Sequence, residues 1–121
     1  MSDPRHELGL RAERATATWL TECGWRVLAR RWRSTGGEID LVCLDGSGTL
    51  VAVEVKLRRT ARAGSAVEAL DRRRLGRLRA SLSDYARGTD HWPAGLRIDL
   101  VTATPEGSGW RLARLVGVDA W

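Results

Sequence analysis

The sequence EIDLVCLDGSGTLVAVEVKL, residues 38–57, contains two apolar segments separated by a short polar turn. Residues 38–44 and 50–57 are rich in Val, Ile and Leu, which is typical of β-strands. Between them, DGSG at 45–48 supplies the small residues that a tight hairpin turn requires. This stretch therefore predicts an antiparallel β-hairpin.

Side chains on a strand alternate between its two faces, and this alternation places the charged residues of the hairpin. Glu38 and Asp40 of the first strand, and Glu54 and Lys56 of the second, are expected on one face. The opposite, apolar face is expected to contain Ile39, Leu41 and Cys43 from the first strand, and Val51, Val53, Val55 and Leu57 from the second.

The register of the hairpin follows from matching the two apolar faces, because a slip of one residue would bury the carboxylates. A three-residue loop, Gly46–Gly48, with a glycine in the left-handed conformation, places Asp40 directly opposite Glu54. Opposed residues have Cβ atoms roughly 4.5 to 5.5 Å apart, so the two carboxylates would repel each other. A divalent cation bound between them would offset this repulsion, and Mg²⁺ prefers such oxygen ligands. The alternative is an ordinary solvent-facing strand edge.

Lys56 is the one lysine among the twenty Lys and Arg residues of the chain. An ammonium group is a compact point charge on a flexible stem, whereas a guanidinium is a planar fork that stays protonated. We therefore expect position 56 to need the chemistry of lysine, although one residue among twenty can also be lysine by chance.

Hydrophobic periodicity predicts two helices outside the hairpin. The first covers residues 8–23 and ends at Gly24, and the second covers residues 65–87, with Ser65 as N-cap and Glu68 completing a capping box. The apolar stripe of the first helix is expected to contain Leu8, Ala12, Ala15, Trp19 and Cys23. Further strands are expected at 25–33, 96–103 and 110–117, with turns at 34–37 and 105–109. The expected fold is α/β with the order αβββαββ, in a single domain of residues 1–121.

The composition is typical of a globular protein, with 43% hydrophobic and 29% charged residues. No apolar run approaches the roughly 20 residues of a membrane helix, and the N-terminus lacks the features of a secretory signal, so we expect a cytoplasmic protein. The net charge of +5 favours a polyanionic partner, with a solvated arginine-rich surface as the alternative. Cys23, Cys43, His6 and His91 are too isolated to indicate a zinc site.

Several motifs, in this order along the chain, carry a family resemblance. They are Gly9 and Glu13 in the first helix, CGWRVLARRWR at 23–33, GEIDLV at 37–42, VEVKLRR at 53–59, GSAVEAL at 64–70 and RIDLV at 97–101. Together they resemble the YraN family of small bacterial proteins, which belongs to the restriction-endonuclease-like PD-(D/E)xK superfamily. Archaeal-type Holliday junction resolvases look similar in arrangement.

The resemblance implies a central mixed sheet flanked by helices. It also implies that Asp40 and Glu54 are metal ligands, Lys56 is the catalytic lysine and Glu13 is an accessory acid. An ordinary exposed helix residue is the alternative for Glu13. Glu38 is a candidate supporting or capping group, and Asp99 matches a strand Asp of the family. The chain departs from the family pattern at three positions, which are Ala12, Arg31 and Asp71, where a Gly, an Asn and a basic residue are usual. A phosphate contact expected at position 71 would then shift to a neighbour such as Arg72 or Arg74.

These features together predict a Mg²⁺- or Mn²⁺-dependent nuclease that acts on DNA. The backbone carbonyl of Val55 is the expected third metal ligand beside Asp40 and Glu54. Arginines that contact phosphates position DNA without reading its sequence, and the candidates are Arg30, Arg31, Arg33, Arg58, Arg59 and Arg62. Since no base-reading motif is present, we expect recognition of branched, flap or single-stranded DNA, and a homodimer is compatible with the sequence.

Two other classes of function remain open. One is a catalytically inactive nucleic-acid-binding or scaffold protein that keeps the nuclease-like fold, and the other is a subunit whose basic face binds an acidic protein. Trp25 and Trp32 lie among the arginines of the strand at 25–33, where a Trp can stack on an unpaired base, but core packing is the expected use.

Overall fold

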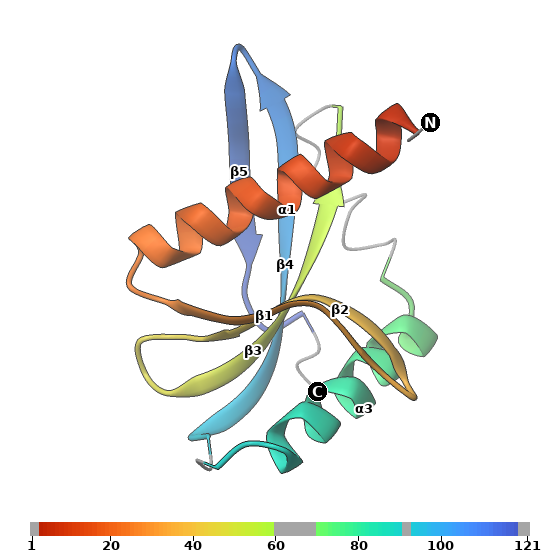
Figure 1. The fold of residues 1–121 in the computed structure, drawn as a ribbon, viewed down its shortest axis with the longest axis vertical. Helices are drawn as coiled ribbons and strands as arrows, with labels where there is room; N and C mark the ends of the chain where they lie inside the picture. Colours follow the sequence, from red (N-terminus) through yellow and green to blue (C-terminus); the bar gives the residue numbers. More distant parts are fainter. Residues whose placement is uncertain (1–2, 60–69, 91–92, 119–121) are drawn as a thin grey trace.

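The computed structural model of the 121-residue chain describes residues 3–59, 70–90 and 93–118. Its elements are α1 (Pro4–Glu22), β1 (Arg26–Ser34), β2 (Gly37–Leu44), β3 (Thr49–Leu57), α3 (Arg72–Arg87), β4 (Gly95–Glu106) and β5 (Gly109–Leu115). The order is a helix, three strands, a helix and two strands, so the predicted α/β fold and the order αβββαββ are confirmed (Figure 1).

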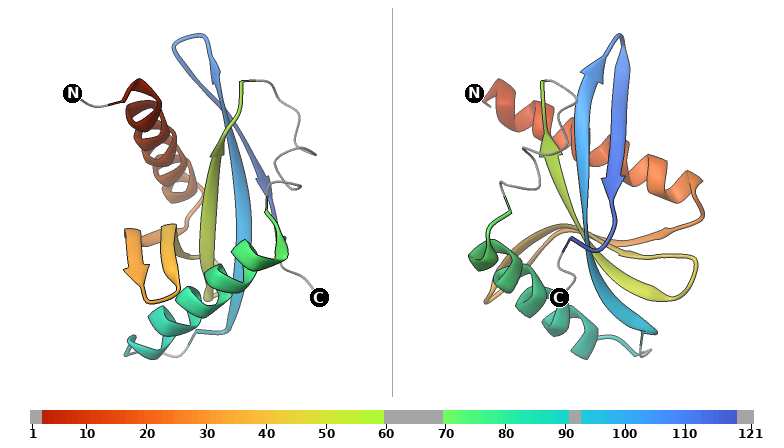
Figure 2. Two further views of the ribbon diagram at one scale, coloured as in Figure 1. Left: turned by 90° about the vertical axis from the view of Figure 1, so that its right-hand side faces the viewer. Right: turned by 180° about the vertical axis from the view of Figure 1, so that it is seen from behind.

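The strands form one five-stranded mixed sheet in the order β1-β2-β3-β4-β5. β3 and β4 are parallel, whereas the other neighbouring pairs are antiparallel. α3 lies in the connection between the two parallel strands, which cannot be joined by a tight turn. The ribbon shows α1 crossing one side of the sheet and α3 lying on the other (Figure 2).

Two buried clusters attach the helices to the sheet. On one face, Ala17 and Leu20 of α1 pack with Val51 and Val53 of β3. The other face is covered by α3, whose buried residues Leu78, Leu82 and Ala86 pack with Ile39, Val42, Leu50, Ala52 and Ile98. β3 is therefore covered on both faces, which explains why its sequence is an almost continuous apolar run.

The hairpin between β2 and β3 has the predicted register. Leu41 lies opposite Val53 and Leu44 lies opposite Leu50, and the backbone N–H of Asp45 donates to the carbonyl of Thr49 at 3.0 Å. Gly48 has a φ of +87°, the left-handed conformation that the three-residue loop requires. The expected three-residue loop is therefore confirmed.

The predicted alternation along β2 is wrong at Ile39. This residue packs with the α3 cluster, whereas Leu41 packs with the α1 cluster. The two residues should share a face if the strand were regular. The change of face occurs at Asp40, next to Arg31 of β1, whose φ of +48° is unusual for a non-glycine residue. A left-handed residue interrupts the pleat, and the sequence carries no signal for it.

The helix boundaries also differ from the prediction. α1 begins earlier, at Pro4, because Asp3 caps it, and its exposed end at Cys23 does not join the buried stripe. The second helix was predicted from residue 65, but α3 begins at Arg72 after the N-cap Asp71. The predicted N-cap and capping-box residues, Ser65 and Glu68, lie outside the described residues. In the described part of the chain, no helix is long and apolar enough to cross a membrane.

Candidate functional site

Asp40 lies where β2 separates from β3. The pairing of the two strands ends with Leu41 opposite Val53, and Asp40 is the next residue of β2. The N–H of Val55 has no backbone partner in β2 beyond this point. Instead it donates a hydrogen bond of 2.8 Å to Oδ2 of Asp40. Asp40 is thus held beside the end of β3, next to Glu54.

The backbone carbonyl of Val55 points to the same side as Asp40. In a strand, the N–H and C=O groups of one residue point toward the same neighbour, and successive residues alternate. The N–H of Arg58 donates to the carbonyl of Ala103 in β4 at 2.9 Å, so the even-numbered residues bond toward β4. The carbonyl of Val55 therefore faces the β2 side, where the predicted third ligand would have to be.

The neighbouring Glu54 strongly perturbs the carboxyl group of Asp40. Burial, the side-chain hydrogen bond with Glu54 and the charge of Glu54 raise the pKa of Asp40 to about 8, and the N–H of Val55 opposes this rise. Glu54 itself is only 3% exposed. Such a close pair of acids, one buried and one half-buried, is a feature that functional sites frequently show.

Arg74 of α3 pairs with Glu54. Its Nε lies 2.9 Å and its Nη2 lies 2.7 Å from Oε2 of Glu54, and Nη2 also donates to the carbonyl oxygen of Glu38 at 3.3 Å. Asp71 caps the helix and accepts a hydrogen bond of 2.8 Å from the backbone N–H of Arg74. The position at which the family resemblance suggested a basic residue therefore stabilises the helix that carries Arg74.

Arg74 was named from the sequence only as a substitute phosphate contact, and its contact with Glu54 was missed. One signal was present, because Arg74 precedes the buried Leu78 by four residues and so lies on the face of α3 that meets the sheet. Helical spacing alone does not say which carboxylate a long side chain reaches.

Lys56 and Glu13 come from two different elements, β3 and α1. Lys56 is half-buried on β3, two residues after Glu54 and therefore on the same face. Within the described residues, Lys56 has no ion pair or side-chain hydrogen bond. Glu13 of α1 is half-buried, and its pKa is raised by burial and by the charges of Glu38 and Glu54, while Arg31 opposes the rise. Asp40, Glu54 and Glu13 thus lie close enough to influence one another, and Lys56 shares the strand face of Glu54.

The predicted phosphate-binding arginines have different surroundings. Arg31 and Arg33 donate to the carboxylate of Glu38 at 3.4 and 3.0 Å, so that Glu38 holds two of them on β1. Arg30 and Arg59 are exposed, and Arg58 is half-buried at the end of β3. Arg62 lies outside the described residues.

Trp25, which precedes β1, and Trp32 within β1 are packing residues, as expected. Trp25 is 9% exposed, and the guanidinium groups of Arg97 and Arg114 lie over its ring at 5.8 and 4.8 Å. Trp32 is half-buried and contacts Tyr85 edge to face, with 5.2 Å between ring centroids. Cys43 is likewise buried among apolar side chains.

Asp99, for which the sequence suggested no mechanism, is a fully buried structural acid. Arg97 donates to it at 2.8 and 3.1 Å, Arg114 donates at 3.0 Å, and the backbone N–H of Gly117 donates at 2.9 Å. Arg97 also bonds Asp45 at 2.9 Å. This network connects the hairpin turn, β4 and β5.

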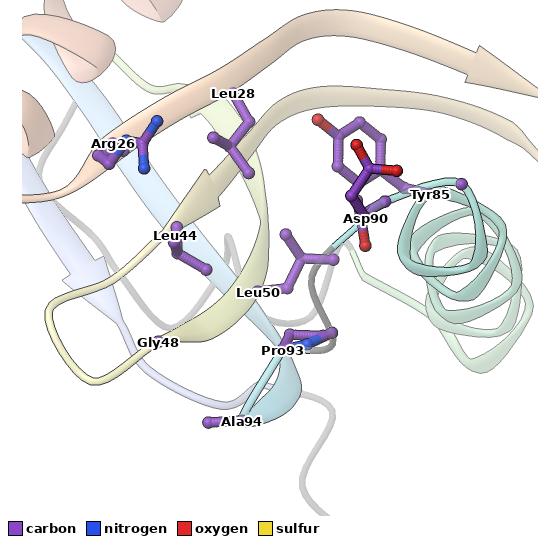
Figure 3. A pocket seen from close by; sticks show the side chains of 11 residues that line it. Arg26, Leu28, Leu44, Gly48, Leu50, Tyr85, Asp90, Pro93 and Ala94 are labelled. Atoms are coloured by element: carbon purple, nitrogen blue, oxygen red, sulfur yellow. The ribbon is translucent and has the colours of Figure 1, made fainter.

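A pocket of about 610 Å³ lies away from the carboxylates. It opens between the β1–β3 strands and the C-terminal end of α3, with Leu28, Leu44 and Leu50 on one side and Tyr85 on the other (Figure 3). None of Asp40, Glu54 and Lys56 lines it, so it is not the site described above.

The donor set fits a divalent cation that keeps several waters. Among the described residues, no group of three His, Cys, Asp or Glu side chains forms a metal site. Asp40 and Glu54 would supply two carboxylates to such an ion, and the carbonyl of Val55 would supply a third oxygen. Mg²⁺ is commonly bound by one or two carboxylates with retained waters, so this small set is adequate for that ion.

Comparison with known proteins places the chain among bacterial relatives. Residues 12–103 match the family described as "Uncharacterised protein family UPF0102". The chain is 40% identical to a UPF0102 protein of Renibacterium salmoninarum over 113 residues, which cover 93% of this chain and 95% of the relative. It is 44% identical to a UPF0102 protein of Symbiobacterium thermophilum over 112 residues, which cover 90% and 92% of the two chains. The resemblance seen in the sequence is thereby confirmed, and the chain belongs to the UPF0102 (YraN) family.

Proposed function

We propose that the protein is a Mg²⁺- or Mn²⁺-dependent nuclease that hydrolyses phosphodiester bonds in DNA. The observation that carries this proposal is the half-buried Asp40 beside the buried Glu54, with the pKa of Asp40 raised to about 8. Two adjacent acids shielded from solvent repel each other, and a bound divalent cation would offset this repulsion. The αβββαββ order supports the proposal, and so does the presence of the motif residues Asp40, Glu54 and Lys56 on β2 and β3.

Each residue of the site has a role in this proposal. Asp40, Glu54 and the carbonyl of Val55 would hold the cation, which when bound polarises a phosphoryl oxygen and lowers the pKa of water. Lys56 orients the attacking water or stabilises the negative charge that develops on the phosphate. Glu13 is the accessory acid that the family resemblance implies, and burial raises the pKa of its carboxyl group.

The substrate class follows from the arginines and from the lack of base-reading elements. Arg30 and Arg59 are exposed, and Arg58 directly follows β3, the strand that carries Lys56, so phosphate contacts close to the site are available. Such contacts hold the DNA backbone without reading the sequence. We therefore expect recognition of DNA structure, in branched, flap or single-stranded substrates, by a cytoplasmic protein.

The deciding experiment combines metal binding with a substrate panel. Purified protein with Mg²⁺ or Mn²⁺ is incubated with duplex, single-stranded, flap and four-way DNA, with Asp40→Asn as the inactive control. Cleavage of at least one substrate by the wild type, and of none by the variant, is the expected result. Calorimetric titration should show Mn²⁺ binding that is lost in the variant. Equal cleavage by both proteins would point to a contaminant and contradict the proposed site.

One observation favours a second candidate function, a catalytically inactive DNA-binding or scaffold protein. Arg74 already neutralises Glu54 at 2.7 Å, and a protein that binds no cation would need such a counter-ion. For this candidate, calorimetry shows no Mn²⁺ binding, while DNA affinity is the same in Asp40→Asn and the wild type.

A further inference from the structure

Arg74 contacts both strands that carry the candidate ligands. From α3, its guanidinium reaches Glu54 of β3 through Nε and Nη2, and it reaches the carbonyl of Glu38 in β2 through Nη2. The side chain is 26% exposed, whereas that of Glu54 is 4% exposed. Asp71 fixes the backbone of Arg74, so the side chain is held at both of its ends.

Each of the two acidic side chains is held by one of its oxygens. Val55 donates to Oδ2 of Asp40, and both nitrogens of Arg74 approach Oε2 of Glu54. Across residues 3–59, 70–90 and 93–118, no N–H group donates to Oδ1 of Asp40 or to Oε1 of Glu54, and the two carboxyl groups contact each other. One oxygen of each acid therefore remains for a ligand, and the other oxygen fixes the orientation of the group.

We propose that Arg74 is a positioning residue of the metal site, which holds Glu54 through Oε2 and thereby presents Oε1 to a divalent cation shared with Asp40. This inference rests on the proposed function, because it assigns the carboxylates to a metal. Outer groups that orient metal ligands typically change metal affinity by about 10- to 100-fold when they are removed.

The direction in which metal affinity changes when Arg74 is replaced separates a positioning role from simple charge repulsion. A guanidinium beside a cation site repels the cation, so its removal should tighten metal binding if charge alone mattered. If Arg74 positions Glu54, its removal should weaken metal binding in spite of the lost positive charge. A variant of Arg74 therefore gives opposite results for the two interpretations.

The test compares Arg74→Met with Arg73→Met by calorimetric titration of the metal-free proteins with Mn²⁺. Arg73 is an exposed neighbour in the same helical turn, so its variant removes the same charge without touching Glu54. We expect the Kd for Mn²⁺ to rise about 10- to 100-fold in Arg74→Met and to stay near the wild-type value in Arg73→Met. An unchanged or lower Kd in Arg74→Met overturns this inference alone, whereas a wild type that binds no Mn²⁺ overturns the proposed metal site as well.

A merely structural role, in which Arg74 only attaches α3 to the sheet, is tested with Arg74→Lys. Lysine keeps the positive charge but lacks the two-nitrogen fork that bonds Glu54 and Glu38 together. We expect Arg74→Lys to recover the melting temperature of the metal-free protein more fully than the Mn²⁺ affinity. Recovery of both in parallel would show that Arg74 is only structural.

The wild-type protein provides a measurement that does not depend on the folding of any variant. In ¹⁵N-labelled protein, the Nε–H signal of Arg74 reports its hydrogen bond to Glu54, and the diamagnetic ion Mg²⁺ leaves this signal observable. We expect the Nε–H of Arg74 to remain protected from solvent exchange at saturating Mg²⁺. Loss of protection on Mg²⁺ binding would mean that Arg74 leaves Glu54 when the cation arrives, and would overturn the positioning role.

Discussion

Asp40 illustrates how one residue connects stability with the proposed chemistry. Its pKa of about 8 lies far above the usual value of a carboxyl group, so the folded protein binds a proton there that the unfolded chain releases near pH 4. Stability should therefore fall as the pH rises through the window from roughly pH 4 to pH 8, because the unfolded state binds fewer protons there. Metal-free protein is expected to be less stable at pH 9 than at pH 5 for this reason.

Asp40→Asn should remove this penalty. The amide oxygen can still accept the hydrogen bond from Val55, while the charge beside Glu54 is lost. We predict that the variant has no nuclease activity, and that in chelator its melting temperature equals or exceeds that of the wild type, with the largest gain above pH 8. Thermal melts at pH 5 and pH 9 measure this. A marked loss of stability at both pH values would mean that Asp40 serves only the fold.

Lys56→Arg tests whether position 56 needs an amine rather than a charge. Because Lys56 has no ion pair with the described residues, the substitution should leave the fold and the DNA affinity close to those of the wild type. The cleavage rate should fall by on the order of a hundredfold, as for the loss of a group that acts in the transition state. Single-turnover cleavage at the wild-type rate would return Lys56 to the ordinary surface charges.

Among the elements, β4 depends on Asp99. This acid is fully buried and joins Arg97 and Arg114, so Asp99→Asn would leave Arg114 with an uncharged partner and Arg97 with Asp45 as its one remaining carboxylate among the described residues. We predict a loss of about 3 to 5 kcal/mol in the free energy of unfolding, as for other broken buried pairs. Asp84→Asn is the matched control, since its pair with Arg87 is largely exposed and should be worth less than about 1 kcal/mol. Denaturant titration of both variants compares them, and equal losses would contradict the structural role of Asp99.

The elements that the sequence predicted well are those fixed by local chemistry. The hairpin register followed from the turn glycines and from two apolar faces, and this register brought Asp40 to Glu54. The change of face at Ile39 could not be foreseen, because it accompanies the left-handed backbone of Arg31 on a neighbouring strand.

The sequence also did not predict contacts between elements that are far apart along the chain. The pairing of Arg74 with Glu54 spans 20 residues and depends on how α3 lies against the sheet. The start of α3 was also misplaced, since Asp71 was interpreted as a departure from the family pattern rather than as an N-cap. Periodicity predicts which face of a helix is buried, but the partner of a long polar side chain depends on the tertiary arrangement.

At the scale of the whole molecule, the ends of two strands and one helix meet at the candidate site. β2 leaves β3 at Asp40, β3 continues through Lys56 to Leu57, and Arg74 in the first turn of α3 reaches Glu54. The opposite end of α3, at Arg87, is roughly 20 Å from Arg74 at 1.5 Å per residue. Positive charges at the two ends of α3 should therefore contribute differently to DNA binding.

Arg58→Ala and Arg59→Ala test the DNA surface beside the site. Contacts between arginine and phosphate release counterions, so the affinity for DNA should fall log-linearly with salt, and each lost contact should reduce the slope by about 1. We predict that both variants weaken binding to duplex, flap and single-stranded DNA alike, because phosphate contacts do not read sequence. Arg87→Ala removes the same charge at the far end of α3 and should leave the slope close to that of the wild type. Binding titrations from low to moderate salt distinguish the cases. If Arg58→Ala, Arg59→Ala and Arg87→Ala all have the same salt slope, the DNA binds elsewhere. Binding that does not depend on salt would favour a protein partner for the basic face.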